Sequence, residues 1–169
     1  EAEILRRAGL KEKILVLTAV LDKFAPEFVI HNIVPTVVNF NFARKLNQAA
    51  KRANKVVPIH VKIDTGMGRL GVNDHEAVSL VKKLACLKNI KLEGVFTHFP
   101  AADSDKKFTL SQIKKFKQFI LRLEKAGITF KYHHCANSAG ICAYRGAHFN
   151  LVRPGLMLYG IKPITPMPI

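Results

Sequence analysis

The strongest constraint on the fold is the regular alternation of short apolar, β-branched runs with stretches of helical periodicity along the 169 residues. Residues 14–20 form a near-continuous apolar run, which is typical of a strand buried on both faces. The other expected strands are residues 33–38, 58–64, 92–99, 131–136 and 149–153, and the expected helices between them include residues 40–54, 73–84 and 109–126. Repeated β–α units predict parallel strands joined by right-handed crossovers.

Two α/β architectures are built from such units, a doubly wound open sheet and a (β/α) barrel. No G-x-G-x-x-G motif follows an expected strand, which disfavours an open sheet of the dinucleotide-binding type. A complete eight-unit barrel needs about 250 residues. Six units in one domain over residues 1–169 therefore predict an incomplete (β/α)8 TIM-type barrel from which two units are missing.

The helix expected at residues 109–126 carries a start signal and an apolar stripe. Thr109 and Gln112 have the spacing of a capping box, which predicts that the helix begins near Thr109, and Gly127 is expected to end it. The stripe follows the helical period at Leu110, Ile113, Phe116, Ile120 and Leu123. We therefore expect this helix to pack one face against the sheet.

The chain carries 27 Lys and Arg against 12 Asp and Glu, a net charge of +15. Many of the lysines, such as Lys82, Lys83 and Lys114, lie on the outer faces of expected helices, as on an ordinary solvated surface. The aromatic and basic interleaving of single-strand binders is absent, and so is Cys/His finger spacing. We expect no nucleic-acid partner, and a non-catalytic phosphate- or polyanion-binding basic barrel fragment stays open as an alternative.

Signals for a membrane, a secretory route or a metal are also absent from the sequence. No apolar run reaches the roughly 18–20 residues that a membrane span needs, and residues 1–10 lack the apolar centre of a signal peptide. Cys86, Cys135 and Cys142 have no paired spacing. His133 and His134 are adjacent, so they point to opposite faces of a strand and do not suit a shared metal. We therefore expect a cytoplasmic protein without membrane or metal.

Charged and titratable residues collect where the expected strands end. Lys62, Arg69, His98 and Arg153 each lie at or just after the carboxyl end of such a strand. In a (β/α) barrel these ends meet at one rim, where active sites are built. Ordinary βα turns would explain the glycines of these loops, but they would not explain four such residues in positions that look buried. The pattern favours a functional site at the rim.

A second group of residues at the same rim suits a phosphate. Asn137 and Ser138 precede a short helical turn, where they could form a simple N-cap or could offer backbone N–H groups and a hydroxyl to a phosphate. Gly155, next to Leu156, permits close approach of the backbone to such a group. Because the loops after the last two barrel strands commonly hold phosphate, we expect a phosphate-bearing ligand here.

Four motifs, in the right order, resemble those of the alanine racemase family: HVKIDTGMGRLG at residues 60–71, THF at 97–99, HCANSA at 134–139 and VRPGLMLYG at 152–160. The resemblance implies strands three to eight of an N-terminal (β/α)8 barrel, which in the family is followed by a C-terminal β-domain. It also implies pyridoxal 5'-phosphate as the cofactor and a homodimeric active site. The implied reaction interconverts L- and D-alanine by two-base proton transfer and supplies D-alanine for cell-wall peptidoglycan.

The resemblance further implies roles for residues around the cofactor ring. Arg153 would face the pyridine nitrogen, and because arginine does not readily give up a proton, that nitrogen would stay unprotonated. His98 would line the ring and hold Arg153 by a hydrogen bond. Arg69 would approach the phenolic oxygen and the substrate carboxylate, so Arg69 and His98 would count as catalytic. Lys62 matches a position that is carbamylated in many family members, where it would fix Arg69.

The resemblance assigns the phosphate to a separate set of residues. Ser138, Gly155 and Leu156 would bind the phosphate group, with Asn137 adjacent to them. Tyr159 falls within the last motif and would have only a supporting role. These assignments agree with the phosphate expected at the rim from the residues alone.

The chain departs from the family where the two proton-transferring bases are concerned. The family's Schiff-base lysine motif is not found in this sequence and is expected upstream of Glu1, and the catalytic tyrosine is expected beyond Ile169. We therefore expect the 169-residue chain alone to be inactive. A broader-specificity racemase or a serine racemase of the same fold would share the four motifs, and both stay open as alternatives.

Overall fold

The computed structural model describes residues 1–163 and shows a half-barrel of parallel strands. Its sheet contains β1 (Leu15–Val16), β2 (Val34–Val37), β3 (Val57–Asp64), β4 (Val72–Asn73), β5 (Ile90–Phe96) and β6 (Tyr132–His134). Five strands follow the order β1-β2-β3-β5-β6, and the short β4 pairs with β3 outside this path. Every pairing is parallel, so the predicted incomplete α/β barrel is confirmed.

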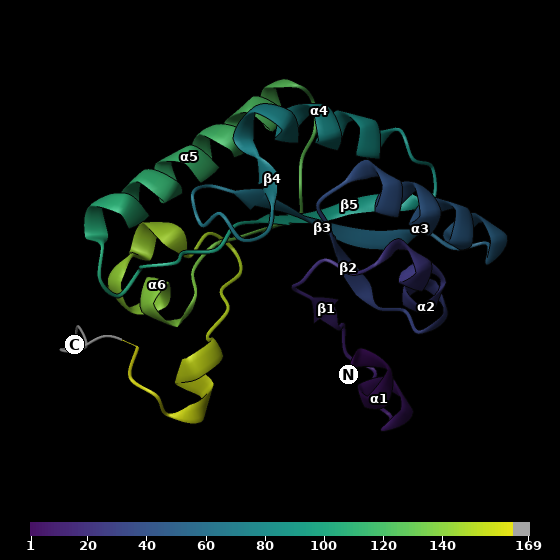
Figure 1. The fold of residues 1–169 in the computed structure, drawn as a ribbon, viewed down its shortest axis with the longest axis horizontal. Coiled ribbons are helices and arrows are strands. Elements are labelled where there is room, and N and C mark those ends of the chain that lie inside the picture. The colour runs from purple at the N-terminus through teal and green to yellow at the C-terminus, as the bar shows by residue number, and fades with distance from the viewer. Residues whose placement is uncertain (164–169) are drawn as a thin grey trace.

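Helices and short 3-10 turns connect the strands. The helices are α1 (Ala2–Arg7), α2 (Ala25–Ile30), α3 (Phe40–Arg52), α4 (Asp74–Ala85), α5 (Lys106–Lys125) and α6 (Ser138–Ala143). The 3-10 turns are η1 (Asp22–Phe24), η2 (Arg145–Ala147) and η3 (Gly155–Tyr159). In Figure 1, α4 and α5 arch over one side of the sheet, whereas α1 and the yellow segment that carries η3 lie on the other side.

Strand β3 separates an apolar outer face from a polar inner face. Ile59 and Val61 are buried and belong to the apolar cluster that also contains Phe116 and Phe119 of α5. Because successive side chains of a strand point to opposite faces, His60, which lies between them, points into the half-barrel. It is nevertheless 2 % exposed, so the inner face is also closed to solvent at this point.

The strand expected at residues 149–153 is not formed, and this prediction is wrong. The backbone N–H of Arg153 donates to the carbonyl of Ala136 at 3.0 Å, but no ladder continues from it. Instead, the Asn150 side chain accepts from the N–H of His133 and donates to the carbonyl of Lys131, both at 2.8 Å. An asparagine amide therefore satisfies the edge of β6 where a backbone ladder was expected.

Two other boundaries also differ from the sequence prediction. Strand β1 covers only part of residues 14–20, because it pairs with β2 at two positions and lies at an edge of the sheet. Helix α5 begins before Thr109, since the side chain of Asp105 accepts from the N–H of Phe108 at 2.8 Å and caps the helix. Thr109 is buried one turn inside, where its hydroxyl donates to the carbonyl of Ala101.

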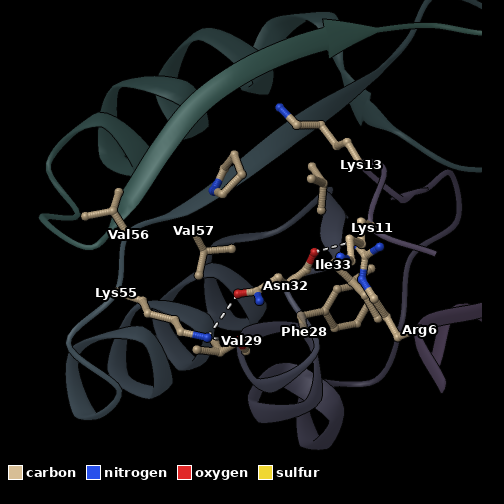
Figure 2. Close-up of a pocket in the computed structure, with 12 residues that line it drawn as sticks. Arg6, Lys11, Lys13, Phe28, Val29, Asn32, Ile33, Lys55, Val56 and Val57 are labelled. Atoms are coloured by element: carbon tan, nitrogen blue, oxygen red, sulfur yellow. Dashed lines mark hydrogen bonds between the residues drawn. The ribbon is translucent and has the colours of Figure 1, made fainter. Parts of the chain in front are cut away.

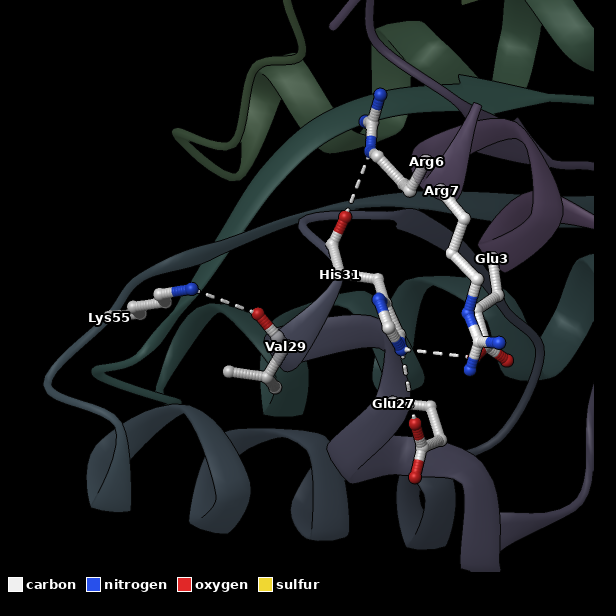
Figure 3. A network of polar contacts seen from close by, with 7 residues as sticks. All are labelled: Glu3, Arg6, Arg7, Glu27, Val29, His31 and Lys55. Atoms are coloured by element: carbon white, nitrogen blue, oxygen red, sulfur yellow. Dashed lines mark hydrogen bonds and ion pairs between the residues drawn. The ribbon is translucent and has the colours of Figure 1, made fainter. Parts of the chain in front are cut away.

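A guanidinium clamp ties α1 to the end of α2. Arg6 donates to the carbonyls of His31 and Asn32 at 2.9 and 3.0 Å, and to those of Leu10 and Glu12 at 2.6 and 2.7 Å. Figure 3 shows this side chain beside the carbonyl of His31 at the end of α2. Because the last carbonyls of a helix have no partner within the helix, a cation here satisfies groups that would otherwise be unpaired.

We predict that Arg6→Ala lowers the free energy of unfolding by about 2 kcal/mol, because it leaves several carbonyls without a donor. The matched control is Arg7→Ala. Arg7 forms an exposed pair with Glu3 on the same helix, so its loss should cost about 0–0.5 kcal/mol. Urea unfolding followed by circular dichroism measures both values, and equal losses for the two variants would contradict the clamp.

Candidate active site

A cavity of about 480 Å³ opens at the carboxyl ends of the strands. It is lined by Leu17, Met67, His98, Phe99, Pro100, Ala102, Asp103, Asn137, Ser138, Ala139, Arg153, Pro154, Gly155, Leu156 and Pro163. These residues come from loops that follow different strands, and the parallel sheet brings them to one end. The volume is in the range of small-molecule sites. The rim predicted from the sequence is therefore hollowed to the size of a ligand.

Arg153 is anchored at the floor of this cavity by the ends of β5 and β6. Its Nη2 donates to the carbonyl of Thr97 at 2.7 Å and to that of Cys135 at 3.1 Å, while Nη1 donates to Nδ1 of His134. Burial lowers the pKa of Arg153 to about 10, which still leaves the guanidinium charged at neutral pH. The site therefore holds a fixed positive charge with several of its N–H groups engaged by the protein.

His98 lies in the same cavity and makes the predicted contact with Arg153, but this contact is long. Its Nδ1 is 3.5 Å from Nη2 of Arg153, at the limit of a hydrogen bond, whereas His134 makes the closer contact. Burial, together with the nearby charges of Arg153, Lys62 and Arg69, lowers the pKa of His98 to about 4. At neutral pH, His98 is a neutral ring beside a cation.

His134 is the functional residue that sequence reasoning missed. From the sequence it is weighed only as a poor metal ligand, although it opens the HCANSA motif and stands two residues before the end of the strand expected at residues 131–136. The signal lay in its position, because a residue at the end of a barrel strand faces the rim. Its ring is fully buried and stacks on Phe96 with 4.6 Å between the ring centroids.

Lys62 and Arg69 line a second cavity, of about 660 Å³, beside the first. Leu17 lines both cavities, so the two spaces adjoin at the end of β1. Lys62 is 4 % exposed, and burial together with the charges of Arg69 and Arg153 lowers its pKa. Among the side chains that the structure describes, none of the cations Lys62, Arg69 and Arg153 has a carboxylate at ion-pair distance, so the site concentrates positive charge.

The residues predicted for a phosphate come together, although Asn137 also has a structural task. Its Oδ1 accepts from the N–H of Gly140 at 2.9 Å and its Nδ2 donates to the carbonyl of Phe99 at 3.2 Å, so it is the N-cap of α6. The Ser138 hydroxyl accepts from the N–H of Met157 at 3.2 Å and keeps its own hydrogen for a ligand. A Cβ placed on Gly155 would lie 3.7 Å from that hydroxyl, which shows how closely the two segments approach.

Leu156 and Tyr159 differ in their relation to the cavity. Leu156 lines it, although 54 % of the residue is exposed. Tyr159 is 82 % exposed and does not line it. The structure therefore places Ser138, Gly155 and Leu156, the residues predicted for the phosphate, at one cavity, with Tyr159 outside it.

A third cavity, of about 370 Å³, lies where β2 and β3 begin, and it is strongly basic. Figure 2 shows Arg6, Lys11, Lys13 and Lys55 around it. Arg6 and Lys55 are bound to carbonyls at the end of α2, and Lys13 forms an ion pair with Glu93 at 2.6 Å. Because these cations already hold the fold together, the rim cavity is the better candidate site.

Among the side chains that the structure describes in residues 1–163, no group of three or more His, Cys, Asp or Glu is placed to hold a metal ion. Over the same residues, no helix combines the length and apolar character needed to cross a membrane.

We predict that the chain loses stability as the pH falls below about 6.5, the ordinary pKa of histidine. Burial lowers the pKa of His60 and His98 to about 4 and that of His134 to about 2. Below about pH 6.5 these histidines therefore become protonated in the unfolded chain while they are still largely neutral in the folded chain. The chain therefore has its full stability at pH values above the pKa of unfolded histidine. It loses stability as the pH falls from there toward the lower pKa values of the folded chain. Urea midpoints between pH 7.5 and 4.5 measure this decrease.

Two variants isolate the contribution of one ring. His98→Asn should reduce the pH dependence of the urea midpoint, because one fewer buried imidazole must charge on unfolding. The exposed His75, changed to Gln, should leave the pH dependence as it is. A midpoint that stays constant between pH 7.5 and 4.5 would show that burial of these rings does not control acid stability.

Comparison with known proteins agrees with this geometry. The family model for the alanine racemase N-terminal domain matches residues 1–163. The alanine racemase of Halothermothrix orenii is 45 % identical over 160 residues, which cover 94 % of this chain and 42 % of that protein. The alanine racemase of Desulforamulus reducens is 41 % identical over 165 residues, covering 96 % of this chain and 45 % of that protein.

Solved structures give the same result. The alanine racemase of Clostridium difficile 630, in complex with cycloserine, has a TM-score of 0.94 and 34 % identity, covering 98 % of this chain and 46 % of that one. The Bacillus anthracis enzyme with bound L-Ala-P has a TM-score of 0.89 and 29 % identity, covering 99 % of this chain and 45 % of that one. The chain spans less than half the length of these relatives. By its sequence and its half-barrel, the chain belongs to the alanine racemase N-terminal domain family.

Proposed function

We propose that residues 1–169 form part of the N-terminal barrel domain of a pyridoxal phosphate-dependent alanine racemase. The observation that carries the proposal is the half-buried guanidinium of Arg153, which lines a ligand-sized cavity and is held there by two carbonyls and an imidazole. The family relationship supports the same activity. The whole protein would interconvert L- and D-alanine in the cytoplasm as a homodimer and would supply D-alanine for peptidoglycan.

The donor set of the rim fits pyridoxal 5'-phosphate. Ser138 keeps a hydroxyl hydrogen for the phosphate, and Gly155 opposite it has no side chain to block the approach. The positive charge of Arg69 and Arg153 suits a ligand with several negative charges. We therefore assign Ser138, Gly155 and Leu156 to the phosphate, with the backbone next to Asn137.

When bound, pyridoxal phosphate supplies an electron sink that weakens the α-C–H bond of an amino acid. Arg153 would donate to the ring nitrogen, and because its own pKa is still about 10, it would not transfer a proton there. The sink would consequently be limited, which favours simple proton exchange over other reactions of the amino acid. His98, neutral at working pH, would line the ring without adding charge.

Arg69 and Lys62 would organise the substrate side of the site. Arg69 would bind the substrate carboxylate by its guanidinium fork. The lowered pKa of Lys62 leaves more of its amine neutral, and a neutral amine can add to carbon dioxide with loss of one proton. The carbamate formed is an anion that would compensate and orient Arg69. The two bases, a lysine and a tyrosine in the family pattern, would come from other parts of the protein.

We predict that the isolated 169-residue chain does not racemise alanine when pyridoxal phosphate is added, because it would lack both bases. The assay compares the appearance of D-alanine from L-alanine with that of the longer protein that contains this chain. Measurable turnover by the isolated chain would overturn this prediction. Competition by serine in the longer protein would reveal a broader substrate range.

We predict that Arg153→Lys weakens the binding of pyridoxal phosphate to the chain by about tenfold or more. A lysine keeps the charge but loses the fork that reaches two carbonyls and His134 together. Isothermal titration calorimetry measures the dissociation constant. Arg145→Lys, at an exposed position on η2, is the matched control and should bind as the unchanged chain does. Equal affinities for both variants would remove Arg153 from the cofactor site.

A further inference from the structure

A continuous row of polar side chains crosses the inside of the half-barrel and ends on Arg153. Lys13 Nζ lies 2.6 Å from Oε1 of Glu93, and Oε2 of Glu93 lies 3.7 Å from Nε2 of His60. His60 Nδ1 is 2.8 Å from Nε2 of His134, whose Nδ1 accepts from Arg153. The row connects the start of β1 with the cavity floor through β5, β3 and β6.

Two features of the β5 backbone, a bulge at Glu93 and the glycine at position 94, make room for this row of side chains. Where β3 pairs with β5, Ile59 lies opposite Leu92 and the next residue, His60, lies opposite Gly94. Glu93 is therefore an extra residue of β5 that has no partner on β3. Such a bulge re-aims the extra side chain, here that of the buried Glu93. A Cβ on Gly94 would overlap the imidazole of His60. Both features make room for polar groups in a barrel interior that branched apolar residues usually fill.

The direction of the hydrogen bonds follows from Arg153. A guanidinium only donates, so Nδ1 of His134 must accept and carries no proton. The proton of neutral His134 then lies on Nε2 and is donated to Nδ1 of His60. The remaining proton of His60 lies on Nε2, which faces the carboxylate of Glu93. Lys13 holds that carboxylate from the other side.

Burial supports this assignment of neutral rings. Burial, helped by the charge of Arg153, lowers the pKa of His134 to about 2. The pKa of His60 is lowered to about 4, chiefly by burial and against the opposing effect of the Glu93 carboxylate. Oε2 of Glu93 has no hydrogen-bond partner among the residues described, so its charge is directed at His60. A buried acceptor left without a donor is costly, and a purely structural row would not need one.

We propose that Glu93 and His60 are positioning residues that fix the Nε2–H tautomer of His134, so that its Nδ1 always presents a lone pair to Arg153. The guanidinium is thereby kept in one orientation at the floor of the cofactor cavity. This inference rests on the proposed function only where it concerns the cofactor, because the tautomers belong to the chain itself.

The test is nitrogen-15 NMR of the 169-residue chain with labelled histidine, at pH 7. The expected spectrum has the proton on Nε2 in both His60 and His134. Glu93→Gln should give His60 a mixture of tautomers, because the neutral amide no longer favours Nε2–H. The matched control is His133→Gln, which changes the neighbouring residue on the opposite face of β6 and should leave both tautomers unchanged. An Nδ1 proton on His134 in the unchanged chain would overturn the proposal.

A second variant keeps the test decisive if Glu93→Gln does not fold. Lys13→Met removes the anchor of Glu93 from a half-exposed position, so it should shift the His60 tautomer in the same direction without disturbing the interior. Tautomers that do not change in either folded variant would overturn the proposal.

A second readout separates this inference from the proposed function. In the longer protein, Glu93→Gln should lower kcat by about tenfold with little change in KM, as is usual when a residue that orients a functional group is lost. If the tautomers shift but the unchanged chain shows no affinity for pyridoxal phosphate, the positioning role holds and the cofactor assignment fails. If the cofactor binds and the tautomers do not respond to Glu93→Gln, the positioning role is wrong.

Discussion

The guanidinium of Arg153 is the interaction on which the rest of the rim depends. It donates to carbonyls at the ends of β5 and β6, while its own backbone N–H donates to Ala136 just beyond β6. The segment at residues 149–153 has no strand ladder to hold it, so these bonds together with the Asn150 amide dock it on the sheet. The same residue therefore closes the fold at this edge and forms the floor of the cavity, and a change there affects both.

The half-buried guanidinium of Arg153 adds to the effect of burial on the titratable groups around it. Burial is the main reason that the pKa values of His60, Lys62, His98 and His134 are lowered, and the charge of Arg153 acts in the same direction on all four. Neutral imidazoles can approach a guanidinium and accept from it, whereas imidazolium ions would be repelled. The only buried carboxylate in this row, Glu93, lies two side chains away, with His60 and His134 between it and Arg153. The positive charge of Arg153 therefore stays available to a ligand.

The repeat of strands and helices was predictable because each unit follows a local period. The eight candidate residues at strand ends were predictable because a parallel sheet brings the ends of its strands together. Three features could not be predicted in this way. Asp105 caps α5 because the preceding loop brings it there, which the spacing of Thr109 and Gln112 does not reveal. Asn150 replaces a strand ladder, although its neighbours alternate as a strand would. The contact of His134 with Arg153 joins residues 19 positions apart, and only the packing of two loops decides it.

The outer and inner faces of the strands have different tasks, and this division explains how the polar interior is tolerated. Alternate residues of β3, such as Ile59 and Val61, belong to the buried apolar cluster that also contains aromatic residues of α5, and this apolar burial stabilises the sheet from outside. The inner face of the strands can then carry polar residues, provided that each polar group has a hydrogen-bond partner. The bulge at Glu93 and the missing side chain at Gly94 make those partners reachable. A larger residue at Gly94 would consequently act on Arg153, because it would displace His60 first and His134 through it.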